Sequence, residues 1–205
     1  AVKLAEESYR KGRLGATQIG YGLPARNLRV IGVTGTNGKT STCNFLNDAL
    51  KHAGYTTALF TTAVIEMAGE RSINTNHTTV PVTKDLFRFL KLAKVKKVDF
   101  VILEVTAHAL HQHKMWGIPI EIAVMTNISQ DHFGTMEKYA QAKARLFSSY
   151  MKPKWCVLNI DDEWFDFYKS ASSGQIFTYG KDKSADLVIQ SLSPSAGGLT
   201  MRFNR

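Results

Sequence analysis

Short runs of apolar and β-branched residues alternate along most of this chain with stretches whose apolar residues recur at helical spacing. The extended runs lie at residues 28–34, 56–62, 99–105, 121–126 and 155–160. The helical stretches lie at residues 39–53, 83–93 and 136–150. Runs that stay apolar throughout, such as residues 99–105, are typical of strands buried on both faces of a parallel sheet. The alternation therefore predicts an α/β fold with a mostly parallel sheet flanked by helices.

The amino end does not follow this alternation. Residues 3–12 predict a short helix, and the glycines that follow, up to Pro24, predict a loop or linker. We therefore divide the chain into a lead or linker at residues 1–27 and a domain at residues 28–205.

Further strand signals lie beside and beyond the alternating part. Residues 63–75 predict a β-hairpin that turns at Ala68, Gly69 and Glu70. After Asp161 the pattern predicts a short helix and then three weak strands. These strands are centred on Ile176, Val188 and Met201. They would form a small β-rich extension at the carboxyl end of the domain.

Charge and composition narrow the class of partner. Lysine and arginine number 26 against 17 acidic residues, and the net charge of +9 suits anionic partners. A basic knot, defined as Lys91, Lys94, Lys96 and Lys97, lies at the end of a predicted helix, and we interpret it as a solvated face. No basic-aromatic stripe or nucleic-acid motif accompanies it, so nucleic acid is not an expected partner.

Membrane and disulfide classes are not indicated either. The sequence has no apolar run of about 18 residues, and its first residues lack the apolar core of a signal peptide. Cys43 and Cys156 cannot build a disulfide framework, and no cysteine and histidine cluster has zinc spacing. We therefore expect a reduced, cytoplasmic protein with no membrane partner, and we expect a monomer. Cys43 itself is interpreted as a small core residue.

A glycine-rich segment between the first predicted strand and the following helix carries the sharpest chemical signal. Residues 32–40 read Gly-Val-Thr-Gly-Thr-Asn-Gly-Lys-Thr, a variant phosphate-binding loop with Val33 where the strict consensus has glycine. In such a loop the backbone N–H groups and the helix N-terminus face phosphate oxygens. Lys39 would neutralise the β- and γ-phosphates, and the Thr40 hydroxyl would reach Mg²⁺. The segment indicates a P-loop NTPase-like sheet; a glycine-rich turn with a chance lysine is the alternative.

Polar residues lie at the carboxyl ends of three predicted strands, where open α/β sheets bind ligands. The first group follows Thr34, the second is Glu104 near the end of its strand, and the third is residues 127–132. A carboxylate that ends an apolar strand is costly unless it is paired or bound to a metal. A carboxylate at residue 104, facing the phosphate loop, is therefore well placed to share Mg²⁺ with Thr40. An exposed acid at the end of the strand is the alternative.

Four segments, in order, resemble the Mur ligase family. The first is the loop at residues 34–40. Residues 104–110 (Glu-Val-Thr-Ala-His-Ala-Leu) resemble the family's E-V-S-S-H-A-L, and residues 126–132 (Thr-Asn-Ile-Ser-Gln-Asp-His) resemble T-N-L-x-x-D-H. Residues 134–147 resemble G-T-M-E-x-Y-x-x-A-K-x-x-L-F. The last two segments are most similar to the branch of the family that adds the third peptide residue.

The resemblance implies an ATP-dependent ligase of peptidoglycan precursor synthesis. Its partners would be ATP, a UDP-N-acetylmuramoyl peptide and an amino acid, joined through an acyl-phosphate intermediate. The resemblance assigns nucleotide binding to Gly35, Thr36, Asn37, Gly38, Lys39, Thr40 and Ser41. It assigns the catalytic centre and two Mg²⁺ ions to Lys39, Thr40, Glu104, His132 and Lys143. It also implies that UDP-binding and carboxyl-terminal domains are missing, so that Arg205 is a truncation point and the fragment is inactive or weakly active.

Lys143 has an unusual role in the resemblance. By its pattern alone it is an exposed lysine of an amphipathic helix. The family reading makes it a lysine carbamylated by CO₂, which turns a cation into an oxygen ligand suited to a hard metal. That reaction requires a neutral amine, and burial favours the neutral form.

The remaining assignments concern the peptide substrate. Thr78 and Thr79 lie where the family has a T-T-P element that contacts the muramoyl substrate, although a turn with a helix cap explains them nearly as well. Thr106 and Lys114 lie where this branch has a substrate-binding serine and arginine. Two other functions stay open: a folylpolyglutamate synthase-like ligase, and a non-catalytic nucleotide-binding fragment or scaffold.

Overall fold

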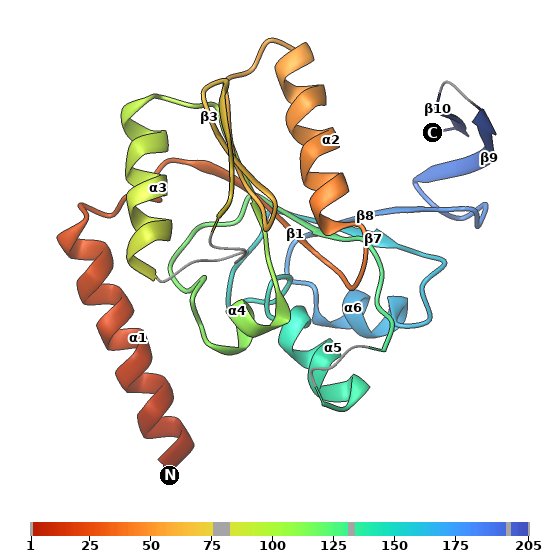
Figure 1. Ribbon diagram of the computed structural model, residues 1–205. Coiled ribbons are helices and arrows are strands. Elements are labelled where there is room, and N and C mark those ends of the chain that lie inside the picture. Colours follow the sequence, from red (N-terminus) through yellow and green to blue (C-terminus); the bar gives the residue numbers. More distant parts are fainter. Residues whose placement is uncertain (1, 76–82, 131–133, 196–197, 205) are drawn as a thin grey trace.

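The computed structural model of the chain describes residues 2–75, 83–130, 134–195 and 198–204. In this part, ten strands form one sheet in the order β10-β9-β8-β7-β6-β1-β5-β2-β3-β4 (Figure 1). The strands are β1 Arg29–Thr34, β2 Thr57–Phe60, β3 Val64–Met67, β4 Glu70–Ile73, β5 Phe100–Glu104, β6 Ile122–Met125, β7 Trp155–Asn159, β8 Gln175–Gly180, β9 Leu187–Ser195 and β10 Gly198–Asn204. Every pairing from β2 through β5, β1, β6, β7 and β8 to β9 is parallel. The expected mostly parallel sheet is confirmed.

The antiparallel parts lie at the two edges of the sheet. β3 and β4 form the expected hairpin on one edge, with Ala68 and Gly69 at its turn. β9 and β10 form a second hairpin, which projects from the other edge (Figure 1). With β8 they are the three strands expected around Ile176, Val188 and Met201, so the β-rich carboxyl-terminal extension is confirmed.

Helices cover both faces of the sheet. They are α1 Val2–Gly20, α2 Lys39–His52, α3 Thr83–Val95, α4 Ala107–His111, α5 Met136–Ala144 and α6 Phe165–Ala171. Side chains alternate along β5, because Phe100 and Ile102 join a cluster with Cys43 of α2. Val101 and Leu103 join the larger cluster, to which α3, α4, α5 and α6 contribute. Helix α2 thus covers one face, α3, α4, α5 and α6 pack on the opposite face, and α1 lies beside α3 (Figure 1).

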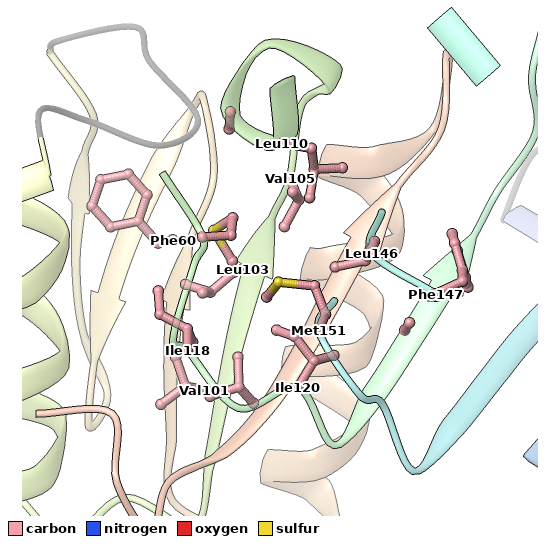
Figure 2. Packing of buried hydrophobic residues seen from close by; sticks show 14 of the residues in the cluster. Phe60, Val101, Leu103, Val105, Leu110, Ile118, Ile120, Leu146, Phe147 and Met151 are labelled. Atoms are coloured by element: carbon pink, nitrogen blue, oxygen red, sulfur yellow. The ribbon is translucent and has the colours of Figure 1, made fainter. Parts of the chain in front are cut away.

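The larger cluster fills the space between the central strands and the segment that follows α5. Figure 2 shows Val101, Leu103 and Ile120 beside Leu146 and Met151. A Cβ on Gly32 of β1 would lie 3.1 Å from Cδ1 of Leu146. The glycine therefore allows Leu146 to pack directly against the strand that leads into the phosphate loop.

The amino-terminal prediction was wrong. Residues 2–20 form one helix, although Gly12 and Gly15 lower helix propensity. A Cβ on Gly15 would lie 3.5 Å from the Trp116 ring, and the Gln18 side-chain amide donates to the Trp116 carbonyl at 2.6 Å. Packing against the segment around Trp116 therefore outweighs the local preference for a loop. The division at residue 27 stays a prediction.

Two differences lie near the site. The helix expected at residues 136–150 ends at Ala144, because Leu146 and Phe147 donate to carbonyls three residues back and so tighten the chain. Both of these side chains are fully buried as a result. The short helix α4 was not predicted. Thr106 caps it by accepting a hydrogen bond from the Ala109 backbone N–H at 3.3 Å.

The exposure of the basic knot agrees with its interpretation as a solvated face. All four lysines of the basic knot are exposed around the end of α3. No helix in the described ranges has both the length and the apolar character to cross a membrane.

Candidate functional site

The phosphate loop leaves β1 after Thr34 and enters α2 at Lys39. Gly38 is the residue before α2 and has a φ of 79°. Gly35 has a φ of 148°, and a Cβ there would lie 1.9 Å from Oγ1 of Thr126. Glycine is therefore required at residue 35 for two reasons, backbone conformation and close approach of a neighbouring segment. Of the expected nucleotide-binding residues, Asn37, Gly38 and Ser41 are exposed, and Thr36, Lys39 and Thr40 are half-buried.

The segment after β6 holds the loop in place. The Thr36 backbone N–H donates to the Asn127 carbonyl at 2.8 Å, and the Asn37 N–H donates to Oδ1 of Asn127 at 3.0 Å. The Thr126 hydroxyl donates to the Asn37 carbonyl at 2.7 Å. Ser129 donates its N–H to the Thr36 hydroxyl at 2.9 Å. These bonds fix the loop against residues 126–129, part of the T-N-L-x-x-D-H-like segment.

Lys39 extends over the loop rather than into solvent. Its amine donates to the Thr36 carbonyl at 2.8 Å. The cation is therefore held above the loop's own backbone, within reach of an anion that the loop would bind.

Glu104 is almost completely buried at the end of β5, with an exposed fraction of 2%. Its carboxylate accepts a hydrogen bond from the Thr40 hydroxyl at 2.9 Å. It accepts two more from the backbone N–H and the hydroxyl of Thr62, at 3.0 and 2.8 Å. The expected proximity of Glu104 and Thr40 is thus present, and the alternative of an exposed acid is wrong.

Lys143 approaches the loop from the opposite face of the sheet. Its exposed fraction is 1%, so the pattern-based reading as an exposed lysine is wrong. Its amine donates to the Gly35 carbonyl at 2.7 Å and lies 4.3 Å from the centre of the Tyr139 ring. The buried amine therefore contacts the phosphate loop itself.

A buried hydroxyl lies on the same side of β1. Within the described residues, Oγ1 of Thr34 is buried and has no hydrogen-bond partner. Gly32 faces Leu146, and side chains two residues apart on a strand share a face, so Thr34 also faces the α5 side. Lys143 lies on α5 and reaches Gly35, the residue after Thr34. The buried Thr34 hydroxyl and the Lys143 amine thus lie on the same side of the start of the loop.

Of the other expected site residues, the structure describes Thr106 and Lys114. Thr106 is half-buried and uses its hydroxyl to cap α4, and Lys114 is half-buried after the same helix. His132, Thr78 and Thr79 lie outside the described residues. In the ranges that are described, no group of three or more His, Cys, Asp or Glu residues could hold a metal ion.

Sequence reasoning missed Thr62 and Thr34, and it correctly interpreted Cys43 as a core residue. Thr62 ends the strand expected at residues 56–62, so the rule that polar residues at carboxyl ends form the site could have found it. Thr34 gave no signal, because a threonine is common within strands. Cys43 is fully buried on α2, and burial, together with the nearby Glu104 carboxylate, raises the pKa of its thiol well above the usual range. It is a packing residue, as expected.

Comparison with known proteins places this site in a family. The family model described as the Mur ligase middle domain matches residues 33–204. The UDP-N-acetylmuramoyl-L-alanyl-D-glutamate--2,6-diaminopimelate ligase of Geobacillus kaustophilus (strain HTA426) is 39% identical over 192 residues, 89% of this chain and 39% of that protein. The chain thus spans about two fifths of the length of the curated relatives it matches.

Solved structures agree. A structure of a ligase with the same printed name superposes with a TM-score of 0.78 at 32% identity, over 86% of this chain and 37% of that chain. A Mycobacterium tuberculosis folylpolyglutamate synthase complexed with ADP gives a TM-score of 0.71 at 17% identity, over 94% of this chain and 50% of that one, which shows the shared fold. The loop, the carboxylate and the lysine at the carboxyl edge of this sheet therefore lie in a chain that belongs to the Mur ligase family, as its middle domain.

Proposed function

We propose that this chain is the ATP-binding domain of a ligase that adds an amino acid to a UDP-N-acetylmuramoyl peptide. The observation that carries the proposal is the convergence of three groups at one edge of the sheet. Lys39 lies over the phosphate loop, the Thr40–Glu104 pair lies at the start of α2, and buried Lys143 lies against Gly35. This supports phosphoryl transfer from ATP to a substrate carboxylate, followed by amide formation.

The loop would bind the nucleotide through groups of this chain. Its backbone N–H groups and the N-terminus of α2 would face the phosphates, and Lys39 would turn from the Thr36 carbonyl to the β- and γ-oxygens. Because Thr126 and Asn127 already hold the loop by hydrogen bonds, little conformational freedom would be lost on binding. Lys39 would then stabilise charge on the transferring group.

The donor set at Thr40 and Glu104 fits Mg²⁺. A hydroxyl and a buried carboxylate are hard oxygen ligands, and Glu104 accepts its hydrogen bonds only from neutral donors of Thr40 and Thr62 among the described contacts. Bound Mg²⁺ would neutralise charge on the phosphate oxygens. A second ion, held by His132 and Lys143, remains part of the proposal.

The surroundings of Lys143 fit a carbamate. Its formation joins Nζ to the carbon of CO₂ and releases one proton from the neutral amine. A carbamate would supply oxygen acceptors on the side where the buried Thr34 hydroxyl has no partner among the described residues. A carbon NMR spectrum of the protein in ¹³CO₂-enriched buffer tests this directly. A carbamate signal that disappears in Lys143→Met supports it, and its absence from the wild-type chain refutes it.

The substrate part of the proposal rests on the relatives. Their printed names specify UDP-N-acetylmuramoyl-L-alanyl-D-glutamate and 2,6-diaminopimelate. We propose the same acceptor class here, with Thr78, Thr79, Thr106 and Lys114 on its acidic peptide. Lys114 would give a point charge where an arginine gives a bidentate fork.

Two measurements test the proposal. The first is phosphate release by the full-length protein with ATP, Mg²⁺ and the dipeptide substrate, in the presence of diaminopimelate or lysine. Release that requires the dipeptide and one amino acid supports the ligase. Release with a folate and glutamate instead would favour the folylpolyglutamate synthase-like alternative, and no release with any pair would leave a nucleotide-binding scaffold.

The second measurement is calorimetric titration of ATP and Mg²⁺ into this chain. Lys39→Ala should bind at least about tenfold more weakly, because it loses a charge-assisted contact to phosphate. Lys91→Ala, on the exposed face of α3, is the matched control and should bind like the wild type. Equal binding by Lys39→Ala and wild type would contradict the assignment of the phosphate loop.

A further inference from the structure

A cavity lies at the amino end of the sheet, at the edge opposite to the phosphate loop. Its volume is about 450 Å³. Four segments line it: the end of α1, residues 23–26 before β1, residues 117–119 before β6, and residues 150–152 before β7. Cavities of about 300 to 1,000 Å³ are the usual size of small-molecule sites.

The floor of this cavity is apolar. Ile118 and Met151 line it, and their exposed fractions are 2% and 5%. Both belong to the larger core cluster, in which Figure 2 shows Met151 beside Ile120. The floor is therefore the outer surface of the packed core, and its atoms are apolar and closely packed.

The rim of the cavity is cationic and polar. Arg26 and Lys152 line it and are exposed, and none of the ten lining residues is acidic. Gln18 and Tyr150 add an amide and a hydroxyl. A cationic rim with no acidic lining residue favours an anion and disfavours a cation.

The walls are held in place by specific contacts. The Gln18 amide is fixed on the Trp116 carbonyl, and Gly117 has a φ of 76° and leaves room for it, because a Cβ there would lie 2.6 Å from Nε2 of Gln18. The Tyr150 hydroxyl lies 2.7 Å from Nδ1 of His113. Lys152 has a φ of 51°, an uncommon conformation for a residue other than glycine. A cavity with fixed walls is prepared for a ligand of defined shape.

We propose that this cavity binds a small amphipathic organic anion. The apolar body of the ligand would lie on Ile118 and Met151, and its carboxylate, sulfonate or phosphate group would pair with Arg26 and Lys152. This site lies away from the carboxyl edge where Lys39 and Glu104 are, so it does not depend on the proposed ligase function. A ligand bound here would contact α1 and the strand entries, and not ATP.

The test uses 8-anilinonaphthalene-1-sulfonate, an aromatic sulfonate whose fluorescence rises when it is bound. The titration is run on the whole chain with saturating ATP and Mg²⁺, which blocks the nucleotide site. The test variant is Arg26→Gln/Lys152→Asn, because asparagine tolerates positive φ. The control, Lys91→Gln/Lys94→Gln, removes the same charge from the exposed face of α3. N-phenyl-1-naphthylamine, which has no charge, reports whether the apolar floor is intact.

The proposal predicts one sulfonate site in the wild type. Its affinity should fall by about tenfold or more in the test variant and less than about twofold in the control. The uncharged probe should bind the test variant as it binds the wild type. Three results would overturn the proposal: no saturable sulfonate binding by the wild type, equal losses in the two variants, or an equal loss of both probes. ATP affinity should not change in either variant, so failure of this site is distinct from failure of the ligase proposal.

Discussion

Replacement of Gly35 by alanine should be far more damaging than the same change at Gly38. At Gly35 the φ of 148° costs alanine about 1 to 3 kcal/mol of backbone strain. The new Cβ would lie 1.9 Å from Oγ1 of Thr126, so Thr126 must move. It would then lose its hydrogen bond to the Asn37 carbonyl at 2.7 Å, worth about 1 kcal/mol. We expect a total loss of about 3 to 5 kcal/mol in the free energy of unfolding.

Gly38 provides the matched control. It also has a positive φ, of 79°, but a Cβ there meets nothing within 4 Å. Gly38→Ala should therefore lower the free energy of unfolding by only about 1 to 2 kcal/mol, the cost of a positive φ for alanine. The assay is urea unfolding followed by circular dichroism, with the slope checked for equal exposure of surface. Equal losses for the two variants would refute the inference that Thr126 presses directly on residue 35.

A double-mutant cycle locates the cause. Thr126→Ala removes the atom that a Cβ at residue 35 would strike, at the cost of the bonds that Thr126 makes to the Asn37 and Thr34 carbonyls. The double variant Gly35→Ala/Thr126→Ala should lose less stability than the sum of the single variants, by more than about 1 kcal/mol. Strict additivity would show that strain at residue 35 alone explains the loss.

Three further predictions concern ionisable groups. Glu104→Gln should weaken binding of ATP with Mg²⁺ by about tenfold or more in calorimetry, and leave binding of metal-free ATP unchanged. Lys143→Met should abolish ligation by the full-length protein but change nucleotide affinity less than about threefold; an equal loss of both would refute separate roles. At Glu66, burial raises the carboxyl pKa, but hydrogen bonds from Lys51 and Asn47 outweigh this and the pKa is lowered. The stability difference between wild type and Glu66→Gln should be constant above about pH 5 and shrink as the pH falls below about 4.3 in acid unfolding series; a constant difference at every pH would refute it.

The strands of the parallel sheet and the phosphate loop could be predicted from the sequence because both depend on local pattern. The apolar run at residues 99–105 became β5, which pairs in parallel with β1 and β2. The loop glycines marked a place where a strand passes into a helix through positions of positive φ. Glu104 was predictable for a related reason, since an acid that ends a buried strand needs a partner.

What could not be predicted depends on contacts between distant segments. Helix α1 is stabilised by Trp116, about a hundred positions away, while its own glycines argue for a loop. Lys143 looks like a surface residue on a helical wheel, but in the folded chain its amine is buried against the Gly35 carbonyl and the Tyr139 ring. A helical pattern reports which side of a helix is apolar. It carries no information about which polar atom on another segment will meet a lysine.

Glu104 and Lys143 reach the phosphate loop from opposite faces of the sheet. Ile102, two residues before Glu104, belongs to the cluster on the α2 face, and Thr40 of α2 is a partner of Glu104. Lys143 lies on α5, which packs on the other face and contacts Gly35 before the loop turns into α2. The loop thus has a carboxylate beside its helix end and an amine beside its strand end. Under the proposed function, the two groups would act at different parts of the phosphate loop, which is the geometric reason to expect separate effects on nucleotide binding and on ligation.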